Sequence, residues 1–341
     1  MSYSVKVEPS KHSFEVEGDE TVLEAALRNG LSFPYGCRNG VCGNCKGLLI
    51  SGEVAYDPEK IGALSDEDKE NNIALFCQAR PKTDLTVEVQ LVSSGNEIEI
   101  KKMPCRVVQK EFLAHDVVAL WLKLPANERL QFLAGQYIDI LLKDGRRRSF
   151  SIANAPHDDE FIELHIRHID GGDFTGHVFD SMKTKAILRI EGPHGSFYLR
   201  EDSDRPIIFM AGGTGFAPTK GIIEHALAEK LSNPMYLYWG ARANRDLYMK
   251  DLAESWAAKH DKLTFIPVLS DPMPEDNWQG RTGYVHEAIA ADFDDLSGMD
   301  IYACGPPAMV HAGKDVFEKL GLELDHYYSD AFEFQDPKKE D

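Results

Sequence analysis

The sequence predicts three folded domains, which are in order an α+β domain, an antiparallel β-barrel and a doubly wound α/β domain. Three patterns predict this order. The first stretch mixes strand and helix patterns around a loop that holds three of the six cysteines. The second stretch consists of short segments in which polar and apolar residues alternate between turn signals. The third stretch alternates apolar strands with helical patterns, which is typical of a parallel sheet.

The chain of 341 residues is long enough for several domains with separate cores. A polar, glycine-containing run, SSGNEIEIKKM, indicates a linker between the first two domains. We expect the following boundaries: 1–92 for the first domain, 93–103 for the linker, 104–202 for the barrel, 203–335 for the α/β domain and 336–341 for a tail.

The charge and the hydropathy pattern exclude two classes of function. A formal net charge of -19 argues against a nucleic-acid partner, because phosphate backbones are bound by surplus Lys and Arg. Residues 1–20 lack the continuous apolar run of a signal peptide, and no later segment reaches the length of a membrane span. We therefore expect a cytoplasmic protein without a membrane span. Its acidic surface fits a docking partner with a basic patch, or it serves only solubility.

The cysteines of the first domain form a spaced set that points to metal binding. They are Cys37, Cys42, Cys45 and Cys77. In a reducing cytoplasm, clustered cysteines are more often metal ligands or redox groups than disulfides. The pattern C-x4-C-x2-C with one distant cysteine is that of plant-type 2Fe-2S ferredoxins. A structural zinc site also takes four thiolates, but it usually presents them as two C-x2-C pairs.

The residues around the cysteine loop agree with a ferredoxin-like domain. Residues 4–17 predict a β-hairpin, and Thr21 with Glu24 forms a capping box for a helix that Gly30 can end. Residues 85–92, LTVEVQLV, alternate as a closing strand. The first domain therefore resembles the plant-type ferredoxin domain, which has a β-grasp fold. The resemblance implies that the four cysteines hold a 2Fe-2S cluster.

A motif for flavin binding lies within the predicted barrel, in GRRRSFSIA at residues 145–153. It resembles the R-x-[YF]-S motif of the ferredoxin-NADP reductase superfamily. The matching residues are Arg148, Ser149, Phe150 and Ser151. Arg148 can pair with the flavin pyrophosphate, and Phe150 can cover a face of the isoalloxazine ring. Ser151 can form a hydrogen bond near flavin N5.

A second segment supports the flavin site. An arginine run before a strand is often only a solvated edge, but GGDFTGHVFD adds Gly172 and Thr175 at the start of a helix. Such a helix start suits the flavin pyrophosphate. Superfamily members that begin with a ferredoxin domain usually carry FAD, so the resemblance implies FAD and not FMN. It also implies that GPHGSF, residues 192–197, closes the barrel near the flavin.

The α/β domain opens with a strand at residues 207–211, a glycine-rich turn and a helix. A dinucleotide pyrophosphate binds at a turn in this position. The residues assigned to the nucleotide here are Gly212, Gly213, Thr214, Gly215 and Pro218. The superfamily resemblance continues in CGPPAM and SDAF, where it implies that Phe332 shields the flavin face. It also implies that Cys304 approaches the nicotinamide, and it adds Gly305 and Pro306 to the cofactor-binding residues.

The three predicted cofactor sites together indicate an electron-transfer enzyme. A nicotinamide releases two electrons as a hydride, whereas a 2Fe-2S cluster accepts one electron at a time, and a flavin placed between them can do both. Over nearly its whole length the chain resembles the 2Fe-2S/FAD reductases of the ferredoxin-NADP reductase superfamily. The resemblance implies catalytic roles for Ser151, Cys304 and Phe332, and an electron-accepting protein as partner.

Two kinds of partner are compatible with this resemblance. Residues 124–168 and the segment YSDAF look most similar to the CDP-6-deoxy-3,4-glucoseen reductase type, whose partner is a dehydrase. The alternative is the reductase component of a multicomponent oxygenase, of the phenol hydroxylase or methane monooxygenase type. Acceptor choice depends on surface patches around the cluster, and these carry no compact motif.

Two other classes of function fit the sequence less well. A free-standing flavin or ferric reductase does not need a cluster, so the four intact cysteines count against it. A structural iron–sulfur scaffold predicts damage to the flavin or nucleotide motif, and neither motif is damaged. NADH is the expected nucleotide, although Arg242 and Arg245 could hold the 2'-phosphate of NADPH. Cys105 is expected to be a buried small residue without a role.

Overall fold

A computed structural model describes the protein at residues 2–29, 31, 33–35, 38, 40–41, 43–91, 98–126 and 128–332. The chain forms two compact units, Met1–Ile98 and Glu99–Asp341. Among the described residues, no helix combines the length and the apolar character that a membrane crossing requires.

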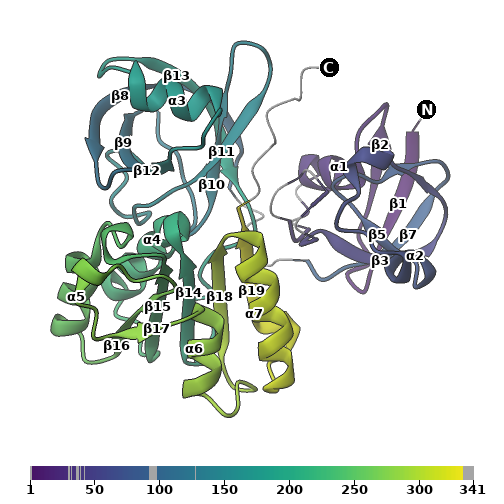
Figure 1. Cartoon of the computed structure of the whole chain (residues 1–341). Coiled ribbons are helices and arrows are strands. Elements are labelled where there is room, and N and C mark those ends of the chain that lie inside the picture. The colour runs from purple at the N-terminus through teal and green to yellow at the C-terminus, as the bar shows by residue number, and fades with distance from the viewer. Residues whose placement is uncertain are drawn as a thin grey trace. The chain divides into compact units, whose positions relative to one another are not determined.

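The first unit contains a mixed five-stranded sheet of order β2-β1-β7-β3-β5 (Figure 1). The strands β1 and β7 are parallel, and the other neighbours are antiparallel. The sheet consists of β1 (Ser2–Glu8), β2 (Ser13–Glu17), β3 (Lys46–Ser51), β5 (Ile73–Leu75) and β7 (Leu85–Glu88). The remaining elements are α1 (Val22–Arg28), β4 (Val54–Ala55), the 3-10 helix η1 (Pro58–Lys60), α2 (Asp66–Glu70) and β6 (Arg80–Pro81). Helix α1 and the sheet enclose one apolar core, as in a β-grasp fold, which confirms the α+β prediction.

Local sequence explains how this unit begins and ends. The predicted hairpin is present as β1 and β2, whose buried side chains alternate with exposed ones. The predicted capping box is present at α1, where the Thr21 hydroxyl accepts a hydrogen bond from the N–H of Glu24 at 3.2 Å. Gly30, which was expected to end this helix, lies outside the described residues. The closing strand β7 ends at Glu88, earlier than predicted, because its neighbour β1 ends at the paired residue Glu8.

The second unit begins with an antiparallel six-stranded sheet of order β11-β10-β13-β8-β9-β12. Its strands are β8 (Lys101–Phe112), β9 (Val117–Lys123), β10 (Tyr137–Leu141), β11 (Arg147–Ser151), β12 (Ile162–Arg167) and β13 (Ile187–His194), and α3 (Asp173–Asp180) follows β12. A single bridge between Ile152 and Leu164 links the residue after β11 to β12, the strand at the other edge, so the sheet curves toward the predicted barrel without a closing ladder among the described residues. Strand β8 begins at Lys101, inside the range expected for the linker, because its first residues pair with β13 as far as Gly192.

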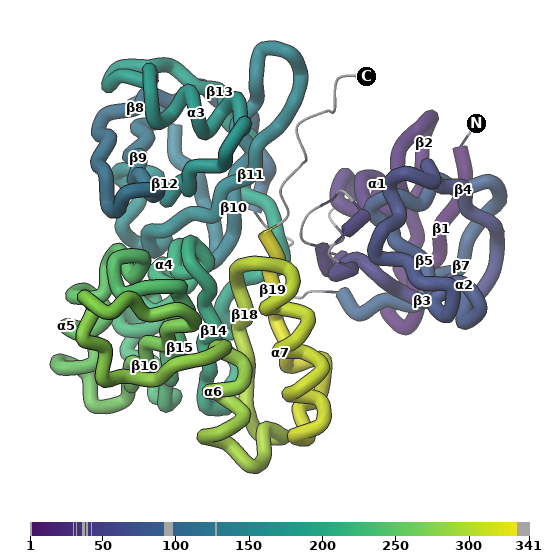
Figure 2. The backbone as a smooth tube through the Cα atoms, in the orientation of Figure 1, coloured from purple at the N-terminus to yellow at the C-terminus, as the bar shows by residue number. Residues whose placement is uncertain are grey.

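The second unit continues with a parallel six-stranded sheet of order β17-β16-β15-β14-β18-β19. Its strands are β14 (Ile207–Gly212), β15 (Met235–Ala241), β16 (Leu263–Leu269), β17 (Arg281–Thr282), β18 (Asp300–Gly305) and β19 (Tyr327–Ala331). The helices are α4 (Phe216–Ala228), α5 (Lys250–Lys259), α6 (Val285–Asp292) and α7 (Pro307–Lys319), with 3-10 helices η2 (Gly213–Gly215), η3 (Asn244–Asp246), η4 (Pro274–Asp276) and η5 (Leu324–His326). Helices α4 and α5 cover one face, and α6 and α7 cover the other. This is the predicted doubly wound domain, and Figure 2 follows the backbone into it from the barrel.

The centre of the parallel sheet brings two turns into backbone contact. The first strand of the domain, β14, lies in the middle of the sheet. The strands β15, β16 and β17 follow in order on one side of it, and β18 and β19 lie on the other side. The carboxyl ends of β14 and β18 therefore flank the switch point at which such sheets bind ligands. A Cβ atom on Gly215 would lie 2.0 Å from the carbonyl oxygen of Cys304, and one on Gly305 would lie 2.7 Å from that of Gly212. Only glycine permits this approach.

Replacing Gly215 with alanine is expected to lower the free energy of unfolding by about 3 kcal/mol. The new methyl group would overlap the backbone of Cys304, and neither the turn nor β18 can shift without displacing a strand of the sheet. Gly298→Ala is the matched control in the same domain, since a Cβ atom there meets nothing within 4 Å. Urea unfolding followed by circular dichroism measures both variants. Equal stability of the two variants would contradict the close packing of the turns.

Candidate functional site

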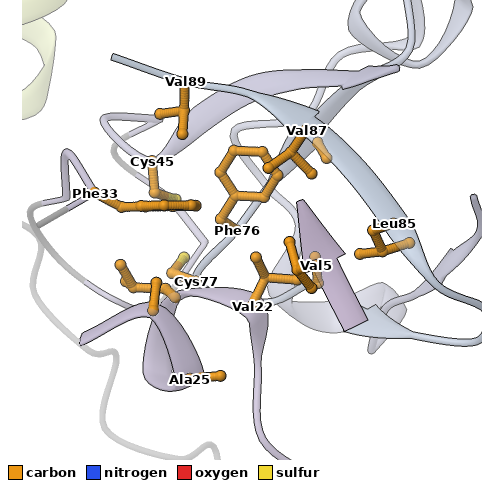
Figure 3. Close-up of a cluster of buried hydrophobic side chains, with 14 of the residues drawn as sticks. Val5, Val22, Ala25, Phe33, Cys45, Phe76, Cys77, Leu85, Val87 and Val89 are labelled. Atoms are coloured by element: carbon orange, nitrogen blue, oxygen red, sulfur yellow. The ribbon is translucent and has the colours of Figure 1, made fainter. Parts of the chain in front are cut away.

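Two of the four predicted cluster ligands lie in the described part of the chain, and both are buried. Cys45 is 3% exposed and directly precedes β3, whereas Cys77 is 5% exposed and follows β5. Figure 3 shows both among the apolar side chains of the first unit. The N–H of Phe76 donates to the carbonyl oxygen of Cys45 at 3.1 Å, which ties the two cysteine segments together. The other predicted ligands, Cys37 and Cys42, lie outside the described residues.

The surroundings of Cys45 and Cys77 suit an iron–sulfur cluster. Burial raises the pKa of Tyr56 to about 12, and both cysteines add to this rise. Gly40 of the predicted cluster loop has a φ of +80°, and a Cβ atom there would lie 1.8 Å from the carbonyl oxygen of Lys60. Buried thiols beside a glycine-dependent loop are the surroundings that a 2Fe-2S cluster needs.

The predicted flavin motif lies on β11, whose side chains alternate between two environments. On one side, the hydroxyl of Ser149 donates to the carboxylate of Asp139 at 2.6 Å. Arg148 and Phe150 occupy the alternate positions and therefore face the opposite side. There the ring of Phe150 meets that of Phe174 in α3, with the ring centroids 5.5 Å apart. The predicted arginine and aromatic residue thus lie on the side of the barrel that α3 covers.

Arg147, which the motif does not include, anchors the other side of β11. Its guanidinium forms ion pairs with Asp139 and Glu191, and the amino group of Lys102 lies 2.9 Å from Glu191. Hydrogen bonds from His194 and from the two cations lower the pKa of Glu191, against the effect of burial. Asp139, Glu191 and His194 are close enough to hold a metal ion. The two cations already supply the positive charge that a metal would bring, so we assign this cluster to barrel stability.

Thr175 shapes the turn at the start of α3, where the flavin pyrophosphate is expected. It is 8% exposed, and its hydroxyl accepts a hydrogen bond from the N–H of Ile169 at 3.2 Å. The same hydroxyl lies 3.2 Å from the carbonyl oxygen of Gly172, the N-cap of the helix. These contacts close the turn, and the first N–H groups of α3 can then bind a phosphate.

The predicted nucleotide residues lie together at the end of β14. Gly212 ends this strand, η2 contains Gly213, Thr214 and Gly215, and the first turn of α4 contains Pro218. Trp239 of β15 holds the turn by donating its indole N–H to the carbonyl oxygen of Gly213 at 3.0 Å. The ring of Phe216 stacks on this indole at 3.8 Å. These contacts fix the backbone of the turn to β15 and to the first residue of α4.

Sequence analysis missed Arg167, which lies beside this turn. A Cβ atom on Gly213 would lie 3.4 Å from the Nη1 atom of Arg167. Asp116 orients the guanidinium through an ion pair of 2.8 Å. Arg167 belongs to β12 of the barrel, and the alternation of FIELHIRHI predicted that strand. The pattern could not show that the polar face of β12 meets the turn after β14.

The remaining predicted residues gather at the end of β18. Cys304 is fully buried, and burial raises the pKa of its thiol well above the ordinary value, so the thiol stays neutral. Pro306 leads into α7, and the carbonyl oxygen of Gly305 accepts a hydrogen bond from the N–H of Phe332 at 2.8 Å. The side chain of Phe332 packs against the apolar cluster that contains Cys304. The structure therefore brings Cys304, Phe332 and the glycine turn of β14 to the same end of the sheet. Cys105, to which no role was assigned, is buried in β8, and burial raises its pKa to about 12.

Three family models match the chain in the order of its domains. The 2Fe-2S iron-sulfur cluster binding domain matches residues 5–82, the oxidoreductase FAD-binding domain matches 104–198, and the oxidoreductase NAD-binding domain matches 209–315. Domains for a 2Fe-2S cluster, FAD and NAD are therefore all present.

Several relatives match this chain over nearly its whole length. The CDP-6-deoxy-L-threo-D-glycero-4-hexulose-3-dehydrase reductase of Yersinia pestis is 41% identical over 332 residues, which are 97% of this chain and 99% of that protein. The phenol hydroxylase P5 protein of Acinetobacter pittii is 35% identical over 314 residues, covering 91% of this chain and 88% of that protein. Among solved structures, the Amycolatopsis cytochrome P450 reductase GcoB is similar with a TM-score of 0.79 and 33% identity, covering 97% of this chain and 98% of that chain.

Replacing Arg148 with alanine is expected to weaken FAD binding by about tenfold to a hundredfold, the value of one charge-assisted hydrogen bond. Its neighbour supplies the matched control, because Arg147 pairs with Asp139 and Glu191 on the other side of the strand. Arg147→Ala should instead lower the melting temperature and leave the FAD dissociation constant within about twofold. Fluorescence titration of the apoprotein with FAD measures both constants. An equal loss of affinity in the two variants would contradict the assignment of Arg148.

Proposed function

This chain belongs to the iron–sulfur flavoprotein reductases that join a plant-type 2Fe-2S domain to FAD- and NAD-binding domains, and on that premise we propose that its electron acceptor is a dehydrase of CDP-6-deoxyhexulose metabolism. Proteins of this construction carry electrons from NAD(P)H through FAD and the cluster. The observation that carries the proposal is the 41% identity to the Yersinia pestis dehydrase reductase, which extends over 99% of that protein. A reductase component of an oxygenase is the second candidate, favoured by the 35% identity to the phenol hydroxylase protein.

The proposed site assigns each residue one task at the nucleotide. The turn of η2 and Arg167 bind the pyrophosphate of NADH, and the neutral thiol of Cys304 contacts the nicotinamide. Phe332 covers the flavin face and moves aside for the nicotinamide, while its backbone bond to Gly305 fixes its starting position. The hydroxyl of Ser151 donates a hydrogen bond at flavin N5. A bound FAD would supply a carrier that can take up two electrons as a hydride and release them one at a time.

NADH is the proposed electron donor. Arg245 belongs to η3, which follows β15, and the carboxylate of Asp246 lies 3.8 Å from its guanidinium. Asp246 also accepts a hydrogen bond from the N–H of Ala243 at 3.0 Å, which keeps this carboxylate in place. A fixed negative charge beside Arg245 disfavours a 2'-phosphate.

The cytoplasm is the proposed location. The four predicted cluster cysteines must be thiolates to bind iron, and a reducing compartment keeps cysteines from forming disulfides. Cell fractionation checks this, since recovery of the protein outside the cytoplasmic fraction would contradict it.

The acceptor proposal is tested with purified partner proteins under anaerobic conditions. NADH should bleach both the flavin and the cluster absorbance, and NADPH should do so with at least about tenfold lower efficiency, a difference of about 1.4 kcal/mol. The reduced protein is then mixed with a CDP-6-deoxyhexulose dehydrase or, as the comparison, with a phenol hydroxylase component. Faster electron transfer to the hydroxylase component would contradict the dehydrase proposal and favour the second candidate, an oxygenase reductase component. Reduction by NADPH alone would contradict the proposed donor.

The order of carriers predicts a separation of two activities in Cys45→Ser. This variant should lose reduction of cytochrome c, a one-electron acceptor, by about a hundredfold or more, because removal of one thiolate disrupts the cluster. Bleaching of the flavin by NADH should remain within about twofold of the wild type. Cys105→Ser is the matched control, since Cys105 is an equally buried cysteine (3% exposed) of the barrel. Loss of flavin bleaching in Cys45→Ser would show that the cluster does not follow the flavin.

A further inference from the structure

One face of strand β12 carries polar side chains into the contact between the barrel and the parallel-sheet domain. Ile162, Leu164 and Ile166 point into the barrel core. The alternate residues Glu163 and His165 are 7% and 5% exposed, so they are buried although they lie outside that core. Buried polar groups need partners, and the partners of these two come from the parallel-sheet domain.

Lys220 of α4 is the partner of Glu163. Its amino group donates to the carboxylate of Glu163 at 2.9 Å and to that of Glu224 at 3.0 Å. It also donates to the carbonyl oxygen of Ala153 at 3.2 Å. Ala153 lies two residues beyond Ser151, the residue assigned to flavin N5. Lys220 is itself only 6% exposed, so one buried cation holds the segment after the flavin-binding strand against the helix after the nucleotide turn.

Tyr248 is the partner of His165 at the other end of the face. The Tyr248 hydroxyl lies 3.0 Å from Nδ1 of His165, and Nε2 of His165 lies 2.8 Å from the carboxylate of Glu163. Burial lowers the pKa of His165, so the ring is neutral. In the tautomer that satisfies both contacts, Nε2–H donates to Glu163 and Nδ1 accepts from the tyrosine. The four residues therefore form one chain of hydrogen bonds.

The charges along this chain persist over the ordinary pH range. Burial opposes ionisation of Glu163, but the hydrogen bond from His165 and the charge of Lys220 lower its pKa to about 2. Burial alone would lower the pKa of Lys220, yet the carboxylates of Glu163 and Glu224 raise it above the ordinary value. Because the pKa of Glu163 is lowered and that of Lys220 is raised from ordinary values of about 4.3 and 10.4, Glu163 is ionised and Lys220 is protonated at neutral pH.

Tyr248 connects this chain to the nucleotide turn. Its ring meets the indole of Trp239 edge to face, with the centroids 5.2 Å apart. That indole donates to the carbonyl oxygen of Gly213, as described above. The path from Gly213 to Ala153 is thus continuous and crosses from one domain to the other.

We propose that Lys220, Glu163, His165 and Tyr248, here called the interdomain chain, set the position of the nucleotide turn relative to the flavin-binding strand. They act as positioning residues for hydride transfer and do not touch the reacting atoms. Hydride transfer requires the donor and acceptor atoms to be held at a reacting distance, and a displacement of about 1 Å can slow such a step by about a hundredfold. The inference rests on the proposed function, since it concerns the step from NADH to FAD.

A second role is consistent with the same contacts, namely that they only stabilise the fold. The two roles predict different variants to be slow. If the contacts only stabilise the fold, any two variants with the same loss of folding stability should reduce the flavin at the same rate. A positioning role predicts that only variants of the interdomain chain react slowly while they still bind FAD and NADH.

The test compares Tyr248→Phe and Lys220→Met with Tyr238→Phe in the FAD- and cluster-loaded protein. Tyr248→Phe keeps the ring and removes only the hydroxyl. Tyr238 is the matched control, because it is a buried tyrosine of the same domain that donates to Asp292 at 2.7 Å, away from the interdomain chain. Stopped-flow absorbance measures flavin reduction by NADH and by NADH deuterated at the transferred position. Hydrogen exchange of the oxidised protein without NADH measures protection of residues 151–155 and 213–220.

The positioning role predicts that Tyr248→Phe slows hydride transfer about tenfold and Lys220→Met about a hundredfold. The NADH dissociation constant should change less than about twofold, the deuterium isotope effect should increase, and protection should fall in both peptides. Tyr238→Phe should react within about twofold of the wild type.

Three results would overturn the inference. The first is an unchanged rate in Tyr248→Phe, the second is an equal loss of rate in Tyr238→Phe, and the third is loss of bound FAD in place of a slower reaction. If Lys220→Met does not fold, Tyr248→Phe alone decides between the two roles. Failure of NADH to reduce the wild-type protein would instead overturn the proposed function, so the two failures are distinguishable.

Discussion

The charge of Lys220 is the constraint on which the arrangement of the second unit depends. A buried ammonium group is unfavourable unless carboxylates and other acceptors surround it, and here two of its three acceptors belong to the barrel. Only one position of helix α4 on the barrel therefore keeps the hydrogen bonds of Lys220 to both Glu163 and Ala153. Because α4 begins directly after the glycine turn, the position of that helix also sets the position of the turn.

The gain from such an ion pair is specificity more than stability. An apolar contact of the same size would stabilise the interface by a similar amount, because the cost of desolvating the buried charges offsets most of their attraction. Apolar surfaces, however, can slide past each other, whereas Glu163, Lys220 and Ala153 satisfy their hydrogen bonds in a single register. An enzyme that transfers a hydride between two domains needs that single register, because the rate depends steeply on the distance between donor and acceptor.

Local sequence patterns predicted the elements and the motifs, but not the contacts between domains. Alternation identified the strands, and glycines after an apolar strand placed the turn at Gly215, which does meet Cys304 at the switch point. Local patterns could not assign different roles to the adjacent residues Arg147 and Arg148, because both carry the same charge. Only the pairing of β11 shows that Arg147 faces Asp139 and Glu191. Lys220 and Glu163 stand 57 residues apart, and no local pattern relates them.

The relatives indicate where partner choice resides. By their names, proteins that match this chain over nearly its whole length serve a hexulose dehydrase, a phenol hydroxylase and a cytochrome P450. Because these proteins match this chain over nearly its whole length, overall similarity of sequence does not select among such different acceptors. Selection must then depend on surfaces that meet the acceptor, where charge complementarity sets specificity and the rate of encounter. The interdomain chain is buried, so a change on an exposed surface that meets the acceptor need not alter its contacts, and one hydride-transfer geometry can serve different acceptors.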